Sequence, residues 1–168
     1  MNADELRAIQ APLKAKYKED ASSASYTLRA EGRLGVDSLG CDVASHIGNV
    51  KAGLHPAAGG DGSMACSADM LLQALVSCAG VTLSVVATAT GTPLKGGTVT
   101  AEGELDFRGT LGISKEVPIG FKAIRLKFAL DTDATPEQLD TLIRLTERYC
   151  VVYQTLKTPP TLEVSRVS

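Results

Sequence analysis

The segment from Met70 to Thr90 contains no Asp, Glu, Lys or Arg, and this uncharged stretch constrains the fold more than any other feature of the chain. Its 21 residues could form a helix long enough to cross a bilayer. However, the segment carries Gln73 and many Ser, Thr, Ala and Gly residues, and neither flank has the cationic bias or aromatic belt of a membrane span. We therefore predict a helix buried on nearly all sides in a protein core, ending at Gly91.

Alternating or glycine-punctuated segments and two further helical segments surround this core helix. Strands are predicted over residues 26–54, 98–107, 120–130 and 161–167. A polar helix is predicted over residues 4–19 with a kink or break at Pro12, and another from Pro136 to about Tyr149 with Asp133 or Thr135 as its cap. Strands separated by dissimilar helices indicate an α+β domain with antiparallel sheets. Because one small sheet can hardly cover a uniformly apolar helix, we expect a second subunit to help bury it.

Length and charge place the chain among ordinary globular proteins. Its 168 residues fit one domain, which we assign to residues 25–168, after an N-terminal helical extension and linker over residues 1–24. The net charge is -2 and no segment is strongly basic, which argues against a nucleic-acid partner. The first 20 residues lack the apolar stretch of a signal peptide, so a cytoplasmic protein is expected.

The four cysteines are the main candidates for chemistry. In a cytoplasmic protein they are more often packing residues, metal ligands or catalytic thiols than a disulfide framework. Cys78 falls in the middle of the uncharged helix and Cys150 at the end of the last predicted helix. Either could pack as a small apolar side chain. Cys41 and Cys66 are interpreted as incidental.

Metal and nucleotide sites are disfavoured by spacing. The cysteines form no Cys-x-x-Cys pair, and His46 and His55 form no His-x-x-x-His pair, so zinc ligation is not predicted. The glycine-rich segment 59–62 lacks the Lys and the Ser or Thr of a phosphate loop. No cofactor is expected.

Two cysteine contexts together resemble the OsmC/Ohr family. The first runs from Gly59-Gly60 through Ser67-Ala68-Asp69 to Ala74-Leu75-Val76-Ser77-Cys78, and the second is Thr146-Glu147-Arg148-Tyr149-Cys150. The resemblance covers residues 25–167 and implies an OsmC-like fold in which two long helices lie at the centre of an intertwined homodimer. It also implies active sites built from both subunits.

The resemblance further implies a peroxidase that reduces organic hydroperoxides. Cys78 would attack the peroxide as a thiolate and Cys150 would resolve the oxidised sulfur as a disulfide. Arg33, in Gly32-Arg33-Leu34-Gly35, matches the family's arginine and would stabilise the thiolate. The expected electron donor is a dithiol, with lipoylated proteins prominent in the family.

The sequence departs from the family where the organic-hydroperoxide branch has a glutamate that holds the arginine, ten residues before the reactive cysteine. That position is Ala68 here, and the neighbouring Asp69 would face another direction on a helix. Glu147 is another acid that could hold Arg33. Two other functions stay open: an OsmC-like protein that binds a small hydrophobic ligand in the dimer cleft without catalysis, and a redox sensor.

Overall fold

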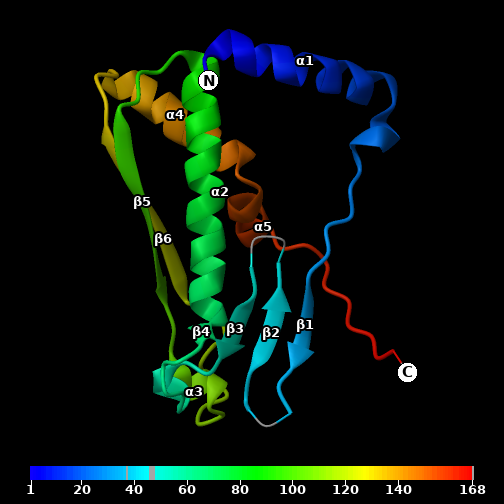
Figure 1. The fold of residues 1–168 in the computed structure, drawn as a ribbon. Coiled ribbons are helices and arrows are strands. Elements are labelled where there is room, and N and C mark those ends of the chain that lie inside the picture. The colour runs from blue at the N-terminus through cyan, green and yellow to red at the C-terminus, as the bar shows by residue number, and fades with distance from the viewer. Residues whose placement is uncertain (37, 46–47, 168) are drawn as a thin grey trace. The chain divides into compact units, whose positions relative to one another are not determined.

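The computed structural model describes residues 1–36, 38–45 and 48–167 (Figure 1). Two compact units make up the chain. We call Met1–Ile9, Ala74–Thr100 and Lys127–Ser168 the cysteine unit, and Gln10–Gln73 with Ala101–Leu126 the sheet unit. The helices are α1 (Ala3–Glu19), α2 (Ser67–Thr90), α3 (Phe107–Thr110), α4 (Pro136–Tyr149) and α5 (Val151–Lys157). The strands are β1 (Glu31–Leu34), β2 (Cys41–Ala44), β3 (Val50–Gly53), β4 (Ala65–Cys66), β5 (Gly96–Glu104) and β6 (Ala123–Asp131), and two short 3-10 turns are η1 (Ala21–Ala24) and η2 (Pro56–Ala58).

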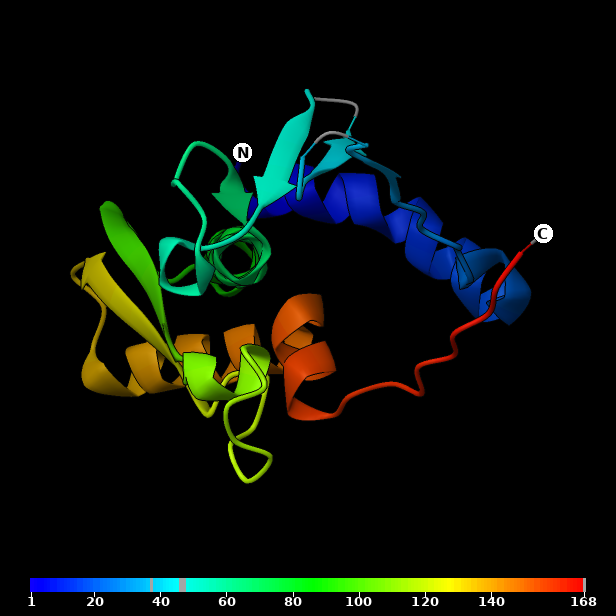
Figure 2. The same ribbon diagram turned by 90° about the horizontal axis from the view of Figure 1, so that it is seen from below.

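The core of the cysteine unit lies where α2 meets α4. Leu83, Val86 and Ala87 of α2 and Leu142 of α4 form one buried cluster, with Phe128 of β6 among the apolar side chains packed against it. Figure 2, which looks along α2, shows α4 and α5 on one side of that helix. The last two-thirds of α2 therefore has a packed face that positions its side chains toward α4 and α5.

Helix α2 confirms the prediction of a long helix over the uncharged segment and begins three residues earlier, at Ser67. Gly91 follows its last residue with a φ of 68°, a left-handed conformation that glycine adopts without strain. Its buried residues are Leu75, Ala79, Leu83, Val86 and Ala87. Val81 is 66% exposed and Val85 38% exposed. A single chain thus buries one face of α2, not nearly all sides as predicted.

Among the residues that the structure describes, α2 is also the one helix long and apolar enough to cross a membrane, judged by length and composition. Core helices of soluble proteins have the same properties, so this is weak evidence for a membrane span. The packing of α2 against α4 and β6 accounts for its apolar composition on the buried face.

The sheet unit contains a four-stranded sheet in the order β1-β2-β3-β4. The first three strands pair antiparallel, as predicted for residues 26–54. The prediction of antiparallel sheets is wrong for β3 and β4, which pair in parallel with Ala52 opposite Ala65. The chain between them passes through η2 and a glycine-rich loop, and this connection brings β4 back alongside β3 in the same direction. Strands β5 and β6 form a separate two-stranded sheet.

Two local predictions near the ends of the chain are corrected, and one helix there was not predicted. Pro12 lies inside α1 without breaking it, since one helix runs from Ala3 to Glu19. Residues 161–167 form no strand, because no neighbouring strand of this chain pairs with them. Residues 151–157, whose two valines do not favour a helix, form α5.

Helix α4 begins and ends as its sequence dictates. Thr135 is its cap: its hydroxyl accepts from the Gln138 N–H, and the Gln138 side chain accepts from the Thr135 N–H at 2.9 Å. Pro136 occupies the first turn, where its missing N–H is not needed. Of the two caps predicted, Thr135 is therefore the correct one.

Leu142→Ala should destabilise the fold by about 2–5 kcal/mol, because Leu142 is 1% exposed in the core and truncation leaves a cavity. Urea unfolding followed by circular dichroism measures this change. Leu111→Ala is the matched control, since Leu111 is 51% exposed and should cost far less. Equal losses in the two variants would contradict the assignment of the core to the α2–α4 contact.

Candidate active site

The break between α4 and α5 falls at Cys150. This residue has an extended backbone, with φ of -72° and ψ of 109°, and is both the C-cap of α4 and the N-cap of α5. Its own N–H donates to the Thr146 carbonyl at 2.9 Å, which closes α4, and its sulfur accepts from the Tyr153 N–H at 3.5 Å, which opens α5. The first N–H groups of a helix have no partner within it. At this junction the Tyr153 N–H, in the first turn of α5, donates to the Cys150 sulfur.

The backbone N–H groups of Val151 and Val152 lie near the sulfur of Cys78 and favour its thiolate. Cys78 is partly buried on α2, and the side chains of Cys150 and Thr82 also favour its thiolate. Burial raises the pKa of the Cys78 thiol, but these neighbouring groups together lower its pKa below the ordinary value. Cys78 is therefore set up as the more acidic thiol.

Cys150 shows the opposite behaviour. It is fully buried, and burial raises the pKa of its thiol. The N–H groups of Tyr153 and Val152 favour the thiolate, but the hydrogen bond to Cys78 and the charge on that sulfur disfavour a second negative charge, so the pKa stays raised. The pair thus consists of a thiolate-prone Cys78 and a protonated Cys150 beside it.

Glu147 ties the two helices together across the junction. Its carboxylate accepts from the Tyr153 hydroxyl at 3.4 Å, and its backbone carbonyl accepts from the Gln154 side chain at 2.7 Å. Burial raises the pKa of Tyr153, and the Glu147 carboxylate raises it further, so the phenol stays a donor. Glu147 therefore supports the bend that carries Cys150.

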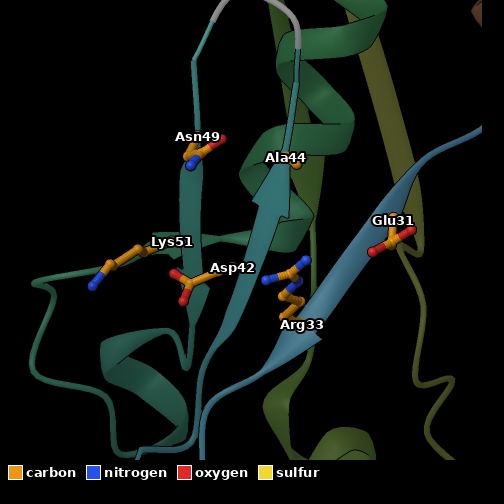
Figure 3. Close-up of a pocket in the computed structure, with 6 residues that line it drawn as sticks. All are labelled: Glu31, Arg33, Asp42, Ala44, Asn49 and Lys51. Atoms are coloured by element: carbon orange, nitrogen blue, oxygen red, sulfur yellow. The ribbon is translucent and has the colours of Figure 1, made fainter.

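Arg33 lies in the sheet unit, within β1. It lines a hollow of about 460 Å³ on one face of the sheet, together with Glu31, Asp42, Ala44, Asn49 and Lys51 (Figure 3). Asp69 is exposed in the first turn of α2 and is not among the residues that line this hollow. Its position there is the one that a helix dipole favours for an acid. The structure thus brings Cys78, Cys150 and Glu147 together in one unit, and places Arg33 and Asp69 in the other.

Comparison with known proteins identifies the family. The model of the family described as "OsmC-like protein" matches residues 60–165. This chain belongs to the OsmC-like protein family. The match spans the glycine-rich loop, all of α2 and both helices that flank Cys150, which confirms the resemblance seen in the sequence.

Solved structures show that the OsmC-like chain has the family's α+β fold. An OsmC-like protein from Mycoplasma pneumoniae is 15% identical, with a TM-score of 0.67, covering 80% of this chain and 90% of that one. An organic hydroperoxide resistance protein OsmC from Legionella pneumophila is 16% identical, with a TM-score of 0.62 and coverages of 79% and 90%. The organic hydroperoxide resistance protein OhrB of Bacillus subtilis is 18% identical, with a TM-score of 0.53 and coverages of 80% and 93%. No curated protein matches in sequence.

The other cysteines and histidines of this OsmC-like protein gather into no metal site that the structure describes. Among residues 1–36, 38–45 and 48–167, no three His, Cys, Asp or Glu side chains could hold a metal ion together. Cys41 and Cys66 are free and partly buried in the sheet unit. The ring of His55 stacks on Phe107, with centroids 4.9 Å apart, and its Nδ1 accepts from the Ala57 N–H. His46 lies outside the described residues.

Sequence reasoning missed two contributions to the environment of Cys78. Thr82 follows Cys78 by four positions on α2, and such residues are neighbours on a helix surface, so the spacing could have indicated it. The N–H groups of Val151 and Val152 gave no signal, because their role depends on α5 and on the bend before it.

Thr82→Val should raise the pKa of Cys78, because it removes a hydroxyl that favours the thiolate while keeping the side-chain shape. Only the thiolate reacts with iodoacetamide, so the rise of the alkylation rate with pH should move to higher pH. At pH 7 we expect a loss of about fivefold, as for one hydrogen bond of about 1 kcal/mol. Mass spectrometry of the Cys78 peptide measures this rate.

Thr88→Val is the matched control, since the Thr88 hydroxyl donates at 2.8 Å to the Ser84 carbonyl on the same helix and not to a cysteine. It should leave the alkylation profile unchanged. A profile for Thr82→Val identical to that of the unaltered protein would show that Thr82 does not stabilise the thiolate.

Proposed function

We propose that this OsmC-like protein is a two-cysteine thiol peroxidase that reduces organic hydroperoxides. The observation that carries the proposal is the contact between Cys78 and Cys150, in which one thiol has a lowered pKa and the other a raised one. A peroxidase of this kind needs a nucleophilic thiolate and a second thiol within reach of it. The presence of organic hydroperoxide resistance proteins among the structural neighbours supports the choice of substrate.

In the first step, the Cys78 thiolate attacks the terminal oxygen of the hydroperoxide. The sulfur–oxygen bond forms as the oxygen–oxygen bond breaks, the alkoxide leaves and takes a proton to become the alcohol, and Cys78 becomes a sulfenic acid. The N–H groups of Val151 and Val152 and the hydroxyl of Thr82 favour the deprotonated sulfur before attack. Arg33 is the proposed source of positive charge for the thiolate and the departing alkoxide.

In the second step, the Cys150 thiol condenses with the sulfenic acid. The sulfur–sulfur bond forms, the hydroxyl leaves with the Cys150 proton as water, and a disulfide protects Cys78 from further oxidation. Burial raises the pKa of Cys150 and the charge on Cys78 raises it further, but this charge is gone once Cys78 is a sulfenic acid, so Cys150 can then ionise and attack. A dithiol reductant, of the lipoyl type in the proposal, then exchanges with the disulfide and restores both thiols. Such exchange is sustained in the reducing cytoplasm, where we place the protein.

One equivalent of cumene hydroperoxide should oxidise the reduced protein at two thiols within seconds to minutes. The physical reason is that the two thiols are near enough to shift each other's pKa before the peroxide arrives. Intact mass should fall by two hydrogen atoms, and peptide mapping should recover a Cys78–Cys150 disulfide. Dihydrolipoamide should restore both thiols faster than glutathione does.

Cys78→Ser should abolish this oxidation, whereas the matched variant Cys41→Ser should leave it intact. Thiols that stay unchanged for minutes in the unaltered protein would contradict the peroxidase and favour an OsmC-like protein that binds a small hydrophobic ligand. A disulfide that forms without peroxide turnover would instead favour a redox sensor.

We further propose that the chain works as an intertwined homodimer. Two extended segments at its ends leave large apolar side chains uncovered: Tyr26, Leu28 and Leu34 in one, and Leu162, Val164 and Val167 in the other. Leu28 is 93% exposed and Val164 is 99% exposed. Soluble monomers rarely leave large apolar patches uncovered. A second copy that pairs with these segments and covers Val81 and Val85 of α2 accounts for all of them.

Sedimentation equilibrium should therefore give the mass of a dimer at micromolar concentration. The double variant Leu162→Glu with Val164→Glu should shift the protein to the monomer, because it places two charges in the proposed interface. Ile113→Glu, at a site that is also exposed, is the control and should stay dimeric. A monomeric mass for the unaltered protein would overturn the proposal.

A further inference from the structure

The register of the four-stranded sheet places an acidic residue directly opposite Arg33. Arg33 of β1 is the direct partner of Asp42 of β2, and Asp42 in turn is the direct partner of Lys51 of β3. Directly opposite residues of an antiparallel pair have their Cβ atoms about 4.5–5.5 Å apart on the same face. A positive, a negative and a positive side chain thus follow one another across three strands.

The other acid on this face is Glu31, which lies on the same strand as Arg33. Glu31 precedes Arg33 by two residues on β1 and lies opposite Ala44. In Figure 3 the guanidinium of Arg33 lies between the carboxylate of Asp42, on the neighbouring strand, and that of Glu31, farther along β1. The ammonium of Lys51 points away from Arg33 in the same view.

An exposed arginine needs such a partner to act in catalysis. Its side chain has many rotamers, and holding one of them costs conformational entropy at the moment of reaction. A carboxylate that accepts from the planar guanidinium fixes its orientation in advance. Asp69 is exposed on the first turn of α2 and does not line the hollow that contains Arg33. Position 68 is an alanine, so it supplies no carboxylate there.

We propose that Asp42 is the positioning residue for Arg33. The organic-hydroperoxide branch uses a glutamate to hold this arginine, and the corresponding position here is Ala68. The proposal rests on the peroxidase function proposed above, in which Arg33 stabilises the Cys78 thiolate and the departing alkoxide. Asp42 touches neither sulfur nor peroxide in this account. It acts through Arg33, so its effect disappears when Arg33 is absent.

The first test needs no catalysis. The exchange of the Arg33 Nε proton with water can be followed by nitrogen-15 NMR, with the resonance assigned from Arg33→Met. Asp42→Asn should bring this exchange to the rate of a free guanidinium, Asp42→Glu should keep it slow, and the matched control Glu31→Gln should leave it unchanged. An exchange rate that Asp42→Asn does not alter would overturn the proposal, whatever the activity.

The second test measures the rate at which cumene hydroperoxide oxidises Cys78. Asp42→Asn should lower the rate constant by about tenfold to a hundredfold, as a misplaced catalytic group does. Asp42→Glu should restore much of the rate, and Glu31→Gln should not change it. The double variant of Asp42→Asn with Arg33→Met should be no slower than Arg33→Met alone.

The outcomes separate the two proposals. Additive losses in the double variant would overturn the inference, because Asp42 would then act without Arg33. Equal losses in Asp42→Asn and Glu31→Gln would also overturn it, since the effect would then be one of net charge. If the unaltered protein does not react with the hydroperoxide at all, the peroxidase proposal fails, and the exchange of the Arg33 proton still decides whether Asp42 holds the guanidinium.

Discussion

The contact between Cys78 and the bend at Cys150 is the interaction on which the proposed chemistry depends. Cys78 lies on an apolar helix, where burial opposes a negative charge. Helix α4 ends at Cys150 and α5 starts there, so two N–H groups that a continuous helix would have used internally are free to favour the thiolate. A hydrogen bond to a charged group contributes about 1.5–3 kcal/mol, and one pKa unit corresponds to about 1.4 kcal/mol. The net effect of the neighbouring groups outweighs the desolvation of the partly buried sulfur and lowers its pKa.

The same contact gives the two cysteines different tasks. The N–H groups of Val151 and Val152 and the hydroxyl of Thr82 favour charge on Cys78. Once Cys78 is charged, it disfavours charge on Cys150, which is more deeply buried. The nucleophile and the resolving thiol are thus distinguished by their surroundings. Glu147, bonded to Tyr153 and Gln154 across the bend, ties α4 to α5 where this arrangement is made.

The sequence was sufficient to predict the long uncharged helix and the α+β class, and it narrowed the cap of α4 to Asp133 or Thr135, because each depends on residues close together in the chain. It also indicated Cys78 and Cys150 through the contexts that resemble the OsmC family. It could not reveal α5, whose valines favour strands, nor the N–H groups that α5 directs at Cys78. The register that sets Arg33 opposite Asp42 depends on the turn between β1 and β2, and no periodicity in the sequence fixes it. The extended segment 161–167 was predicted as a strand from its alternation, but alternation alone supplies no partner strand.

The most direct measurement of the central claim is to trap the oxidised sulfur when the second thiol is absent. Cys150→Ser protein would be treated with one equivalent of cumene hydroperoxide in the presence of dimedone, which labels sulfenic acids, and its peptides analysed by mass spectrometry. The account predicts one dimedone adduct on Cys78, and none in the unaltered protein, where Cys150 consumes the sulfenic acid first. An adduct on Cys41 or Cys66 instead, or no adduct on Cys78, would contradict the claim that the bend at Cys150 creates a peroxide-reactive thiolate.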